Sequence, residues 1–303
     1  MQMSARRLGG ALAVVTVLFG CAAGPSAAAT TPVVPVSATD ATDASSSSEF
    51  RDLEKEFGAT LGVYALDTGS GETVGFRADR RFAYASTFKA LQAGVLLKQR
   101  TDREMDRVIR YDESDLLEYA PITSQHVETG MTLGELADAS VRYSDNTAAN
   151  LIFEELGGPR ALDRALERLG DRTTHVDRIE PNLNEAAPGD IRDTSTPRAL
   201  ATDLRTLVLG RALNPADRSV LADLLRRNTT GDNLIRSAVP SDWTVGDKTG
   251  GGRYGTRNDI AVLWPPHGDP IVMAVLSTRP AEDATYDDAL IARAAAVVVD
   301  ELG

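Results

Sequence analysis

The sequence predicts an α+β fold in which the two ends of the chain build one sheet and the middle of the chain is helical. Runs of strand length occur at residues 61–66 and 73–76 and again after residue 244. Helix signals dominate from about residue 78 to residue 226. The chain has 303 residues, 42% of them hydrophobic and 25% charged, which is typical of a soluble globular protein with a substantial core.

Residues 1–25 are predicted to be a signal peptide with a possible lipobox. Arg6 and Arg7 precede an apolar stretch from Leu8 to Gly20, which is the pattern of a secretory signal. The residues before and at Cys21 resemble a bacterial lipoprotein cleavage box, with Cys21 as the lipidated residue. The alternative is ordinary signal cleavage near residues 27–29. Both interpretations predict export, either anchored by lipid to the outer face of the cytoplasmic membrane or secreted or periplasmic.

Residues 26–48 are predicted to be a disordered linker, because Ala, Thr, Ser and Pro cannot bury enough apolar surface to order it. A helix is expected over 49–57. Two strands follow at 61–66 and 73–76, joined by a turn-rich hairpin loop. Together with residues 227–303, residues 49–77 are expected to form the sheet-and-helix domain.

Residues 78–226 are predicted to form an all-helical domain. Helix starts are indicated by a capping box at Thr132, by prolines in first-turn positions at 159 and 197, and by Asn214 before Pro215. Gly170 and Gly210 are typical helix stops. Residues 175–193 lack any period, and a long loop of this kind in a compact domain is usually functional or disordered.

Strand signals return after residue 244. Runs at 244–248, 259–264 and 271–276 predict three strands, and the last two are joined by a hairpin at 265–269. A long final helix is expected from Ala284 to Leu302.

Charge and composition exclude several function classes. The 32 basic and 44 acidic side chains give a net charge of −12, without a basic stripe, which argues against nucleic-acid binding. Any anionic ligand must therefore find a local positive site. Cys21 is the only cysteine, and the three histidines are far apart in the sequence. A metal site, a cysteine nucleophile and a Ser-His-Asp triad are all poor explanations, and we expect no metal and no cofactor.

The pair Ser86 and Lys89 indicates nucleophilic chemistry. It lies at the start of an amphipathic run, Phe88 to Leu97, in which residues three apart share a helix face. The Lys89 amine is then expected to lie against the Ser86 hydroxyl, where it can act as a base once its pKa is lowered. Because Ser-x-x-Lys arises by chance about once per few hundred residues, the pair alone does not establish catalysis.

Further motifs follow in order along the chain. Ser144-Asp145-Asn146 lies between two predicted helices, and Lys248-Thr249-Gly250 ends a predicted strand. With Ser86 and Lys89, these motifs resemble the set of the class A serine β-lactamases. The resemblance covers nearly all of residues 50–303 and includes the segments Tyr119-Ala120-Pro121, Glu180-Pro181-Asn182-Leu183-Asn184, Asn228-Thr229-Thr230-Gly231 and Tyr254-Gly255-Thr256-Arg257-Asn258-Asp259.

The resemblance implies a five-stranded antiparallel sheet flanked by helices, beside an all-helical domain, with the active site between them. It also implies catalytic roles for four residues. Ser86 would be the acylated nucleophile, Lys89 its proton partner and Ser144 a proton relay to the lactam nitrogen. Glu180 would hold the deacylating water together with Asn184. Whether Lys89 or Glu180 takes the Ser86 proton is disputed for the family, and the sequence leaves both open.

Substrate-binding roles are implied in the same way. Asn146 would orient Lys89 and the substrate amide, and Lys248 and Arg257 would attract the substrate carboxylate. The backbone N–H groups of Ser86 and Gly251 would form the oxyanion hole. Tyr119, Thr249 and Gly250 complete the expected binding residues. In the family, Arg178 pairs with Asp193 at the neck of the loop, and the Glu180-Pro181 bond is cis.

The expected activity is hydrolysis of the cyclic amide of penicillins, and also of cephalosporins because Gly251-Gly252-Arg253 is open and cationic, by a monomer that confers antibiotic resistance. A penicillin-binding DD-peptidase is the nearest rival, and Glu180 with Asn184 favours the lactamase. A non-catalytic lipoprotein that binds cell-wall fragments or senses β-lactams would need neither. Ala85 and Gly252 carry no thiols where carbapenem-hydrolysing relatives often have a bridge, which disfavours carbapenemase activity.

Overall fold

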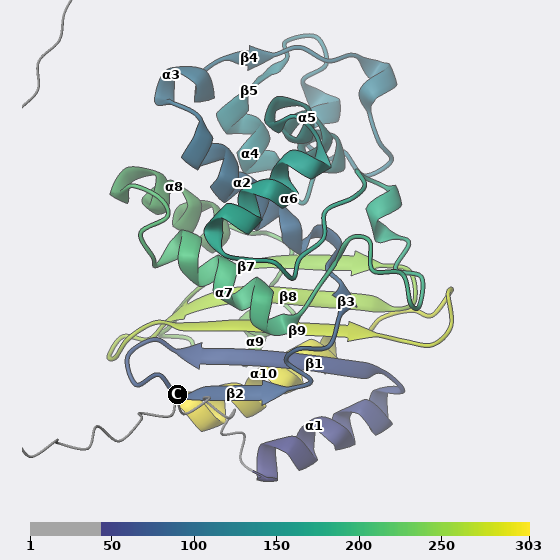
Figure 1. Ribbon diagram of the computed structural model, residues 1–303, viewed down its shortest axis with the longest axis vertical. Helices are drawn as coiled ribbons and strands as arrows, with labels where there is room; N and C mark the ends of the chain where they lie inside the picture. The colour runs from purple at the N-terminus through teal and green to yellow at the C-terminus, as the bar shows by residue number, and fades with distance from the viewer. Residues whose placement is uncertain (1–43) are drawn as a thin grey trace, which may run out of the picture. The chain divides into compact units, whose positions relative to one another are not determined.

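The computed structural model describes residues 44–303, and the predicted signal peptide and most of the predicted linker lie outside this range. A five-stranded antiparallel sheet in the order β2-β1-β9-β8-β7 forms one part of the described chain (Figure 1). Its strands come from both ends of this range, and the residues between them are mainly helical. The α+β class and the five-stranded antiparallel sheet are confirmed. The strands are β1 (Thr60–Asp67), β2 (Thr73–Phe76), β7 (Thr244–Gly252), β8 (Thr256–Trp264) and β9 (Ile271–Thr278).

The central strands are apolar on both sides because helices cover both faces of the sheet. On β9, Ile271, Met273 and Val275 belong to one apolar cluster, while Val272 and Ala274 belong to the other. This alternation follows from the two-residue period of a strand. It also explains why the sequence of β9 is a continuous apolar run, which is typical of strands buried on both faces.

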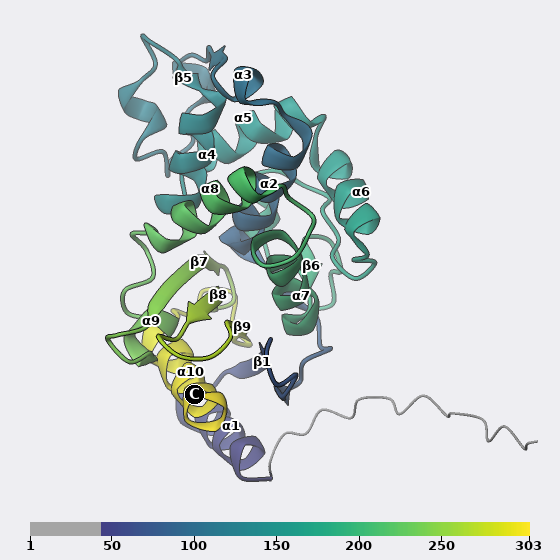
Figure 2. The same ribbon diagram turned by 90° about the vertical axis from the view of Figure 1, so that its left-hand side faces the viewer.

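One face of the sheet is covered by helices from the two ends of the described range. These are α1 (Ala44–Phe57), α10 (Asp288–Leu302) and the short α9 (Ile235–Ala238), which lie together in Figure 2. The helix α1 begins five residues earlier than predicted, so the prediction of a linker is wrong for residues 44–48. Ser46 is buried, and its hydroxyl donates to the Glu301 carboxylate of α10. This contact joins the two ends of the described range and involves a serine run that has no local helix signal.

The other face of the sheet is covered by α7 (Pro197–Val208) and α8 (Pro215–Arg226), which contact β9 and β7 respectively. Both helices also pack against α2 (Phe88–Gln99). The two domains predicted from the sequence therefore form one compact unit over the described residues, because α7 and α8 share one apolar cluster with this face of the sheet and with the other helices.

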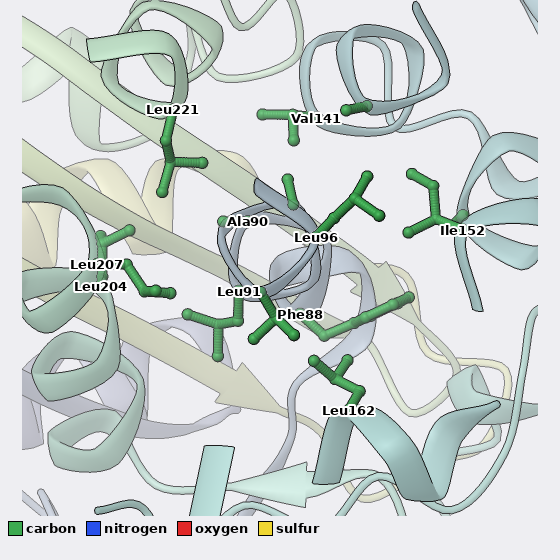
Figure 3. Packing of buried hydrophobic residues seen from close by; sticks show 14 of the residues in the cluster. Phe88, Ala90, Leu91, Leu96, Val141, Ile152, Leu162, Leu204, Leu207 and Leu221 are labelled. Atoms are coloured by element: carbon green, nitrogen blue, oxygen red, sulfur yellow. The ribbon is translucent and has the colours of Figure 1, made fainter. Parts of the chain in front are cut away.

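The helix α2 passes through the middle of the helical part. All ten residues from Phe88 to Leu97 are buried, so the prediction of an amphipathic helix is wrong. In Figure 3, apolar side chains from several helices surround it: Val141, Ile152, Leu162, Leu204, Leu207 and Leu221. The Phe88 ring also stacks on Phe153, with the ring centroids 5.2 Å apart. The other helices are α3 (Asp102–Met105), α4 (Leu133–Arg142), α5 (Asn146–Leu156) and α6 (Pro159–Leu169).

Three smaller differences from the predicted elements concern strand and helix bounds. The helical part contains two short strand pairs, β3 (Phe82–Ala83) with β6 (Thr194–Ser195) and β4 (Val108–Ile109) with β5 (Met131–Thr132). The final helix begins at Asp288 rather than Ala284, because Asp287 caps it by accepting from the Ala289 N–H. The strand β7 continues through Gly252, so Lys248 lies inside it and not at its end.

In the part of the chain from residue 44 onward, no helix is both long and apolar enough to cross a bilayer.

Candidate active site

Ser86 lies on a tight turn between the helical part and the sheet. It belongs to the 3-10 helix η1 (Ala85–Thr87), directly before α2. Ala85 has a φ of 47°, a conformation that is unfavourable for a residue with a side chain and is often found at functional sites. The Asn258 amide of β8 holds the turn by donating to the carbonyls of Ala83 and Tyr84, at 2.8 and 3.0 Å.

Strand β7 approaches this turn closely, and Gly250 makes the approach possible. A Cβ atom at Gly250 would lie 2.9 Å from the Tyr84 carbonyl oxygen and 3.2 Å from the Ser86 nitrogen. Any larger residue would therefore push the strand away from Ser86. This contact brings Gly250 and its neighbour Gly251 beside the serine.

Lys89 and Glu180 form a buried ion pair next to Ser86. Their side chains are fully buried, with 3.1 Å between Lys89 Nζ and Glu180 Oε1. The Ser86 hydroxyl donates to the same Glu180 oxygen, at 3.4 Å. Burial lowers the pKa of Lys89, while the charge of Glu180 acts in the opposite direction.

The expected direct contact between the Ser86 hydroxyl and the Lys89 amine is not present among the hydrogen bonds of the described residues. Instead, Lys89 Nζ donates to the Ser144 carbonyl at 2.8 Å and to Asn146 Oδ1 at 2.6 Å. An ammonium has three hydrogens. Those two acceptors and Glu180 are its three nearest acceptors, with Ser144 Oγ further away at 3.5 Å, so the hydrogen bonds connect Ser86 to Lys89 through the Glu180 carboxylate.

Ser144 lies between the two buried lysines. Its φ of 59° places it in a left-handed bend between α4 and α5. The distance from Ser144 Oγ to Lys248 Nζ is 3.1 Å, and that to Lys89 Nζ is 3.5 Å. Ammonium groups only donate, so the Ser144 oxygen accepts from them and its own hydrogen can be donated elsewhere.

The other two residues of this motif fix the loop that carries Tyr119. Asp145 is fully buried and caps α5 by accepting from the Ala148 N–H, while its second oxygen accepts from the N–H groups of Ile122 and Thr123. The Asn146 N–H donates to the Tyr119 carbonyl at 2.9 Å. Tyr119 is 51% exposed at the rim, where an aromatic ring can contact a ligand.

Lys248 lies deep in the site on β7, and burial lowers its pKa to about 7, with the charge of Lys89 as the second cause. Two buried acids, Asp247 and Asp259, act in the opposite direction. Asp247 accepts from Asn228 at 2.6 Å and from the Arg236 guanidinium. Burial raises the pKa of Asp259 well above its usual value, and the charge of Asp247 raises it further.

The loop that carries Glu180 is closed at its neck by a buried ion pair. Arg178 Nε lies 2.5 Å from Asp193 Oδ2, and the Asp193 carboxylate is fully buried. Arg178 also pairs with Glu185 further along the loop. The predicted pairing of Arg178 with Asp193 is confirmed, as is the predicted cis bond between Glu180 and Pro181.

The backbone and side chain of Glu180 are both held. Asn150 on α5 donates to the Glu180 carbonyl at 2.9 Å and accepts from the Glu180 N–H at 3.0 Å. Asn184 Nδ2 donates to Glu180 Oε2. Asn184 Oδ1 is a buried acceptor that receives no hydrogen bond from the protein. The Asn184 carbonyl accepts from the Arg253 N–H, which joins the loop to the end of β7.

Comparison with known proteins decides the family. Residues 45–302 match the model of the β-lactamase enzyme family. A β-lactamase of Amycolatopsis lactamdurans is 60% identical over 255 residues, covering 84% of both chains. The FAR-1 β-lactamase of Nocardia farcinica is 49% identical over 304 residues, covering 100% of this chain and 97% of its own. The class A β-lactamase structure from Clostridium kluyveri has a TM-score of 0.85 at 49% identity, covering 86% of this chain and 99% of its own.

The chain belongs to the class A β-lactamases.

The candidate site of this class A β-lactamase brings the predicted polar residues of the helical part and of β7 into one cluster. Thr249 continues it, with its hydroxyl 2.6 Å from that of Thr230. Arg257 lies beside Gly251 on the neighbouring strand, but its Nε donates to Asp288 at 2.6 Å. The sequence predicted Arg257 as a cation for the substrate and gave no sign of this acidic partner. The cationic character expected of Arg253 is likewise offset by an ion pair with Glu282.

Two residues with clear positions in this β-lactamase were missed by the sequence reasoning. Asn150 holds the Glu180 backbone, and Asn258 holds the Ser86 turn. Asn150 follows Asn146 by four residues on α5, so the two share a helix face. That spacing could have indicated that Asn150 belongs to the site. Asn258 lies in one of the segments that carry the resemblance, but the resemblance implied no role for it.

Proposed function

We propose that this class A β-lactamase hydrolyses the amide of penicillins, and also of cephalosporins, through an acyl-enzyme on Ser86. The Ser86 oxygen forms a bond to the lactam carbonyl carbon, the carbon–nitrogen bond breaks, and the lactam nitrogen takes up a proton. The buried carboxylate of Glu180, within 3.4 Å of Ser86 Oγ, is the observation that carries the proposal. It provides a base for the second half of the reaction, which returns Ser86 to its free state.

The proton of the Ser86 hydroxyl can leave by two routes, and both routes deliver it to the pair formed by Lys89 and Glu180. The Ser86 proton can pass to Glu180, to which the hydroxyl already donates, or to Lys89 in its neutral form. Because Lys89 Nζ and Glu180 Oε1 lie 3.1 Å apart, a proton taken by either group is shared within one pair. Burial lowers the pKa of Lys89 and so favours its action as a base.

In this proposal, Ser144 delivers the proton to the leaving nitrogen. Its oxygen lies within hydrogen-bond distance of both buried lysines, and its hydrogen is available for the substrate. Passage of a proton from Lys89 through Ser144 leaves the serine unchanged. The protonated nitrogen then separates from the acyl group.

Charge placement supports binding of a β-lactam carboxylate. Lys248 and Thr249 present a cation and a hydroxyl on β7, and Arg257 lies across the strand pair beside Gly251. The Ser86 and Gly251 N–H groups are the proposed donors to the carbonyl oxygen as negative charge develops. One such donor is worth about 3 to 4 kcal/mol in comparable enzymes.

Deacylation distinguishes the lactamase from a DD-peptidase or a non-catalytic sensor. Glu180 can take the proton of an attacking water, and Asn184 Oδ1, a buried acceptor without a protein donor, can hold the same water. General-base assistance contributes roughly 10² to 10⁴ in rate. Without it, the ester on Ser86 would persist.

Mass spectrometry of the Glu180→Ala variant with benzylpenicillin tests this mechanism. The variant should still acylate, so a stable adduct on Ser86 is expected while turnover falls about a hundredfold or more. The Ser86→Ala variant should show no adduct, and Glu185→Ala, an exposed glutamate of the same loop, should keep normal turnover. Normal turnover of Glu180→Ala, or an adduct on Ser86→Ala, would refute the assignment.

Export is proposed from the sequence, with attachment through lipidated Cys21 or release after ordinary cleavage, and the active form is proposed to be a monomer. Fractionation of a Cys21→Ser variant tests the attachment. Lipidation predicts that the wild type stays with the membrane while the variant is released. Equal release of both would support ordinary cleavage. Light scattering tests the oligomeric state.

A further inference from the structure

A cavity of about 620 Å³ lies at the end of the sheet where β9 ends and β1 begins. Figure 1 shows this end of the sheet on the right. Its walls are residues 58–60 and 278–280 of the sheet end, residues 80–83 around β3, and residues 186–192 of the loop that carries Glu180. None of the candidate catalytic residues lines it. Cavities of this volume are typical of sites for small organic ligands.

Positive charge is concentrated in this cavity. Four arginines line it, and Asp190 is the one carboxylate among its lining residues: Arg80, Arg81, Arg192 and Arg279 are the cations. Asp190 is engaged by Arg192 at 2.7 Å and also lies 4.0 Å from Arg178. The whole chain carries a net charge of −12, so the cluster is opposite in sign to the protein around it.

Three of these arginines have neutral partners. Arg81 donates to the Thr194 hydroxyl at 3.1 Å and lies 3.3 Å from His175 Nε2. Arg279 donates to the Thr285 carbonyl. The Arg80 guanidinium lies over the Phe82 ring, 5.8 Å from its centroid.

Among the ion pairs within residues 44–303, none involves Arg80, Arg81 or Arg279. The positive charge of Arg80 acts on the nearby Glu54 carboxylate, but Glu54 forms its ion pair with Arg77. Guanidinium groups have five N–H donors and bind carboxylates through two parallel hydrogen bonds. The cluster therefore has charge and donors that the protein leaves uncompensated.

Part of the wall is apolar. Ala187, Pro188 and Ile191 of the loop form it, whereas Phe82 is only 3% exposed. Ile191 is 57% exposed, so its side chain is accessible to an apolar ligand. A ligand that fits this surface needs anionic groups for the arginines and an apolar body between them.

We propose that this cavity binds a small organic dicarboxylate with an apolar body. Its carboxylates pair with Arg80 and Arg279, and its body lies against Pro188 and Ile191 of the loop. Such a ligand contacts the sheet end and the loop together, so it restrains residues 186–192.

Calorimetric titration with isophthalate, an aromatic dicarboxylate, tests the proposal at fixed ionic strength. Wild-type protein should bind one equivalent saturably. The Arg80→Gln/Arg279→Gln variant should bind about tenfold more weakly or worse, because hydrogen bonds between charged groups contribute more binding free energy than neutral ones. Arg211→Gln, an exposed arginine on the helical part, is the matched control and should bind as the wild type does. Hydrogen exchange of residues 186–192 should slow when isophthalate is added.

Two further ligands separate the contributions of charge and body. Dimethyl isophthalate, the neutral ester, should not bind, and inorganic phosphate should bind more weakly than isophthalate. Absence of saturable isophthalate binding, or equal affinity in the Arg80→Gln/Arg279→Gln variant, would overturn the site. Equal affinity for phosphate or for the ester would overturn the assignment of an organic dicarboxylate.

Discussion

Replacement of Asp193 by asparagine should loosen the loop that carries Glu180. The Asp193 carboxylate is fully buried and accepts four hydrogen bonds. Oδ1 accepts from the Tyr84 hydroxyl at 3.1 Å and from the N–H groups of Asp177 and Arg178 at 2.9 and 3.0 Å, and Oδ2 accepts from Arg178 Nε. Asp193 has a φ of 55°, a conformation that asparagine tolerates well. The substitution therefore tests the charge and the acceptor without straining the backbone.

The magnitude follows from the lost ion pair. An asparagine can keep the Oδ1 contacts, but its amide nitrogen would face Arg178 Nε, which places two donors against each other. Loss of one partner of a buried ion pair costs about 3 to 5 kcal/mol. Arg178 keeps Glu185 and its side chain is 15% exposed, so the lower value of about 3 kcal/mol applies.

Hydrogen exchange measured by mass spectrometry reports the free energy of local opening, which this loss should lower. If the amides of residues 178–193 exchange through local opening, about 3 kcal/mol corresponds to roughly hundredfold faster exchange. Asp190→Asn is the control in the same loop, because its pair with Arg192 is partly exposed and should cost less than about 1 kcal/mol. Unchanged exchange in Asp193→Asn, or equal acceleration in both variants, would refute the reasoning.

Three other outcomes can be measured. Because the pKa of Lys248 is lowered to about 7, Lys248 loses its charge above that pH, and kcat/KM for penicillins should fall in the wild type. The profile should stay flatter in Lys248→Arg, because arginine keeps its charge. A level wild-type profile up to about pH 9 would contradict this. Burial raises the pKa of Asp203 well above its usual value, with Asp171 as the second cause, so the stability that Asp203 contributes at low pH is lost as pH rises through that raised pKa. The advantage of the wild type over Asp203→Asn in urea unfolding should therefore be larger near pH 5 than near pH 9, and an equal difference at both would disprove it. Arg257→Ala should raise KM for penicillins without a comparable loss of thermal stability, and normal KM would mean that Asp288 keeps Arg257 from the substrate.

Local rules predicted the helix starts well. The capping box at Thr132 is confirmed by the hydrogen bond from the Glu135 N–H to the Thr132 hydroxyl at 3.1 Å. Pro159, Pro197 and Pro215 all occupy first-turn positions of helices. These signals act within one turn, so a single sequence contains all of the information.

Features that depend on distant residues were predicted less well. The helix α2 looked amphipathic because Lys89 and Gln92 are polar, yet both are buried: Lys89 donates to Asn146, and the Gln92 amide nitrogen donates to the Ala149 carbonyl of α5. Ser46 becomes part of a helix through a partner 255 residues away. Tertiary packing of this kind leaves no local pattern in the sequence.

The candidate site also contains residues that local patterns predict and residues that depend on distant partners. Its motif residues were predicted to meet and do lie together, because each motif has fixed local spacing. The supporting residues Asn150 and Asn258 are single polar positions whose partners are backbone groups far away in the sequence. The pairing of Arg257 with Asp288 spans 31 residues and depends on where α10 begins.

Two buried ammonium groups in one site determine how the site responds to a substrate. Each of Lys89 and Lys248 loses hydration, and the positive charge of Lys89 lowers the pKa of Lys248 further. Glu180 pairs directly with Lys89. Lys248 has no such carboxylate within the described chain, and its nearest acceptors are the Ser144 hydroxyl and the Thr249 carbonyl. An anionic substrate beside Lys248 would raise its pKa and restore its full charge, so binding of the carboxylate and uptake of a proton are coupled. Because the same lysine contacts Ser144, a bound carboxylate would also fix the hydroxyl that we propose as the proton donor to the leaving nitrogen.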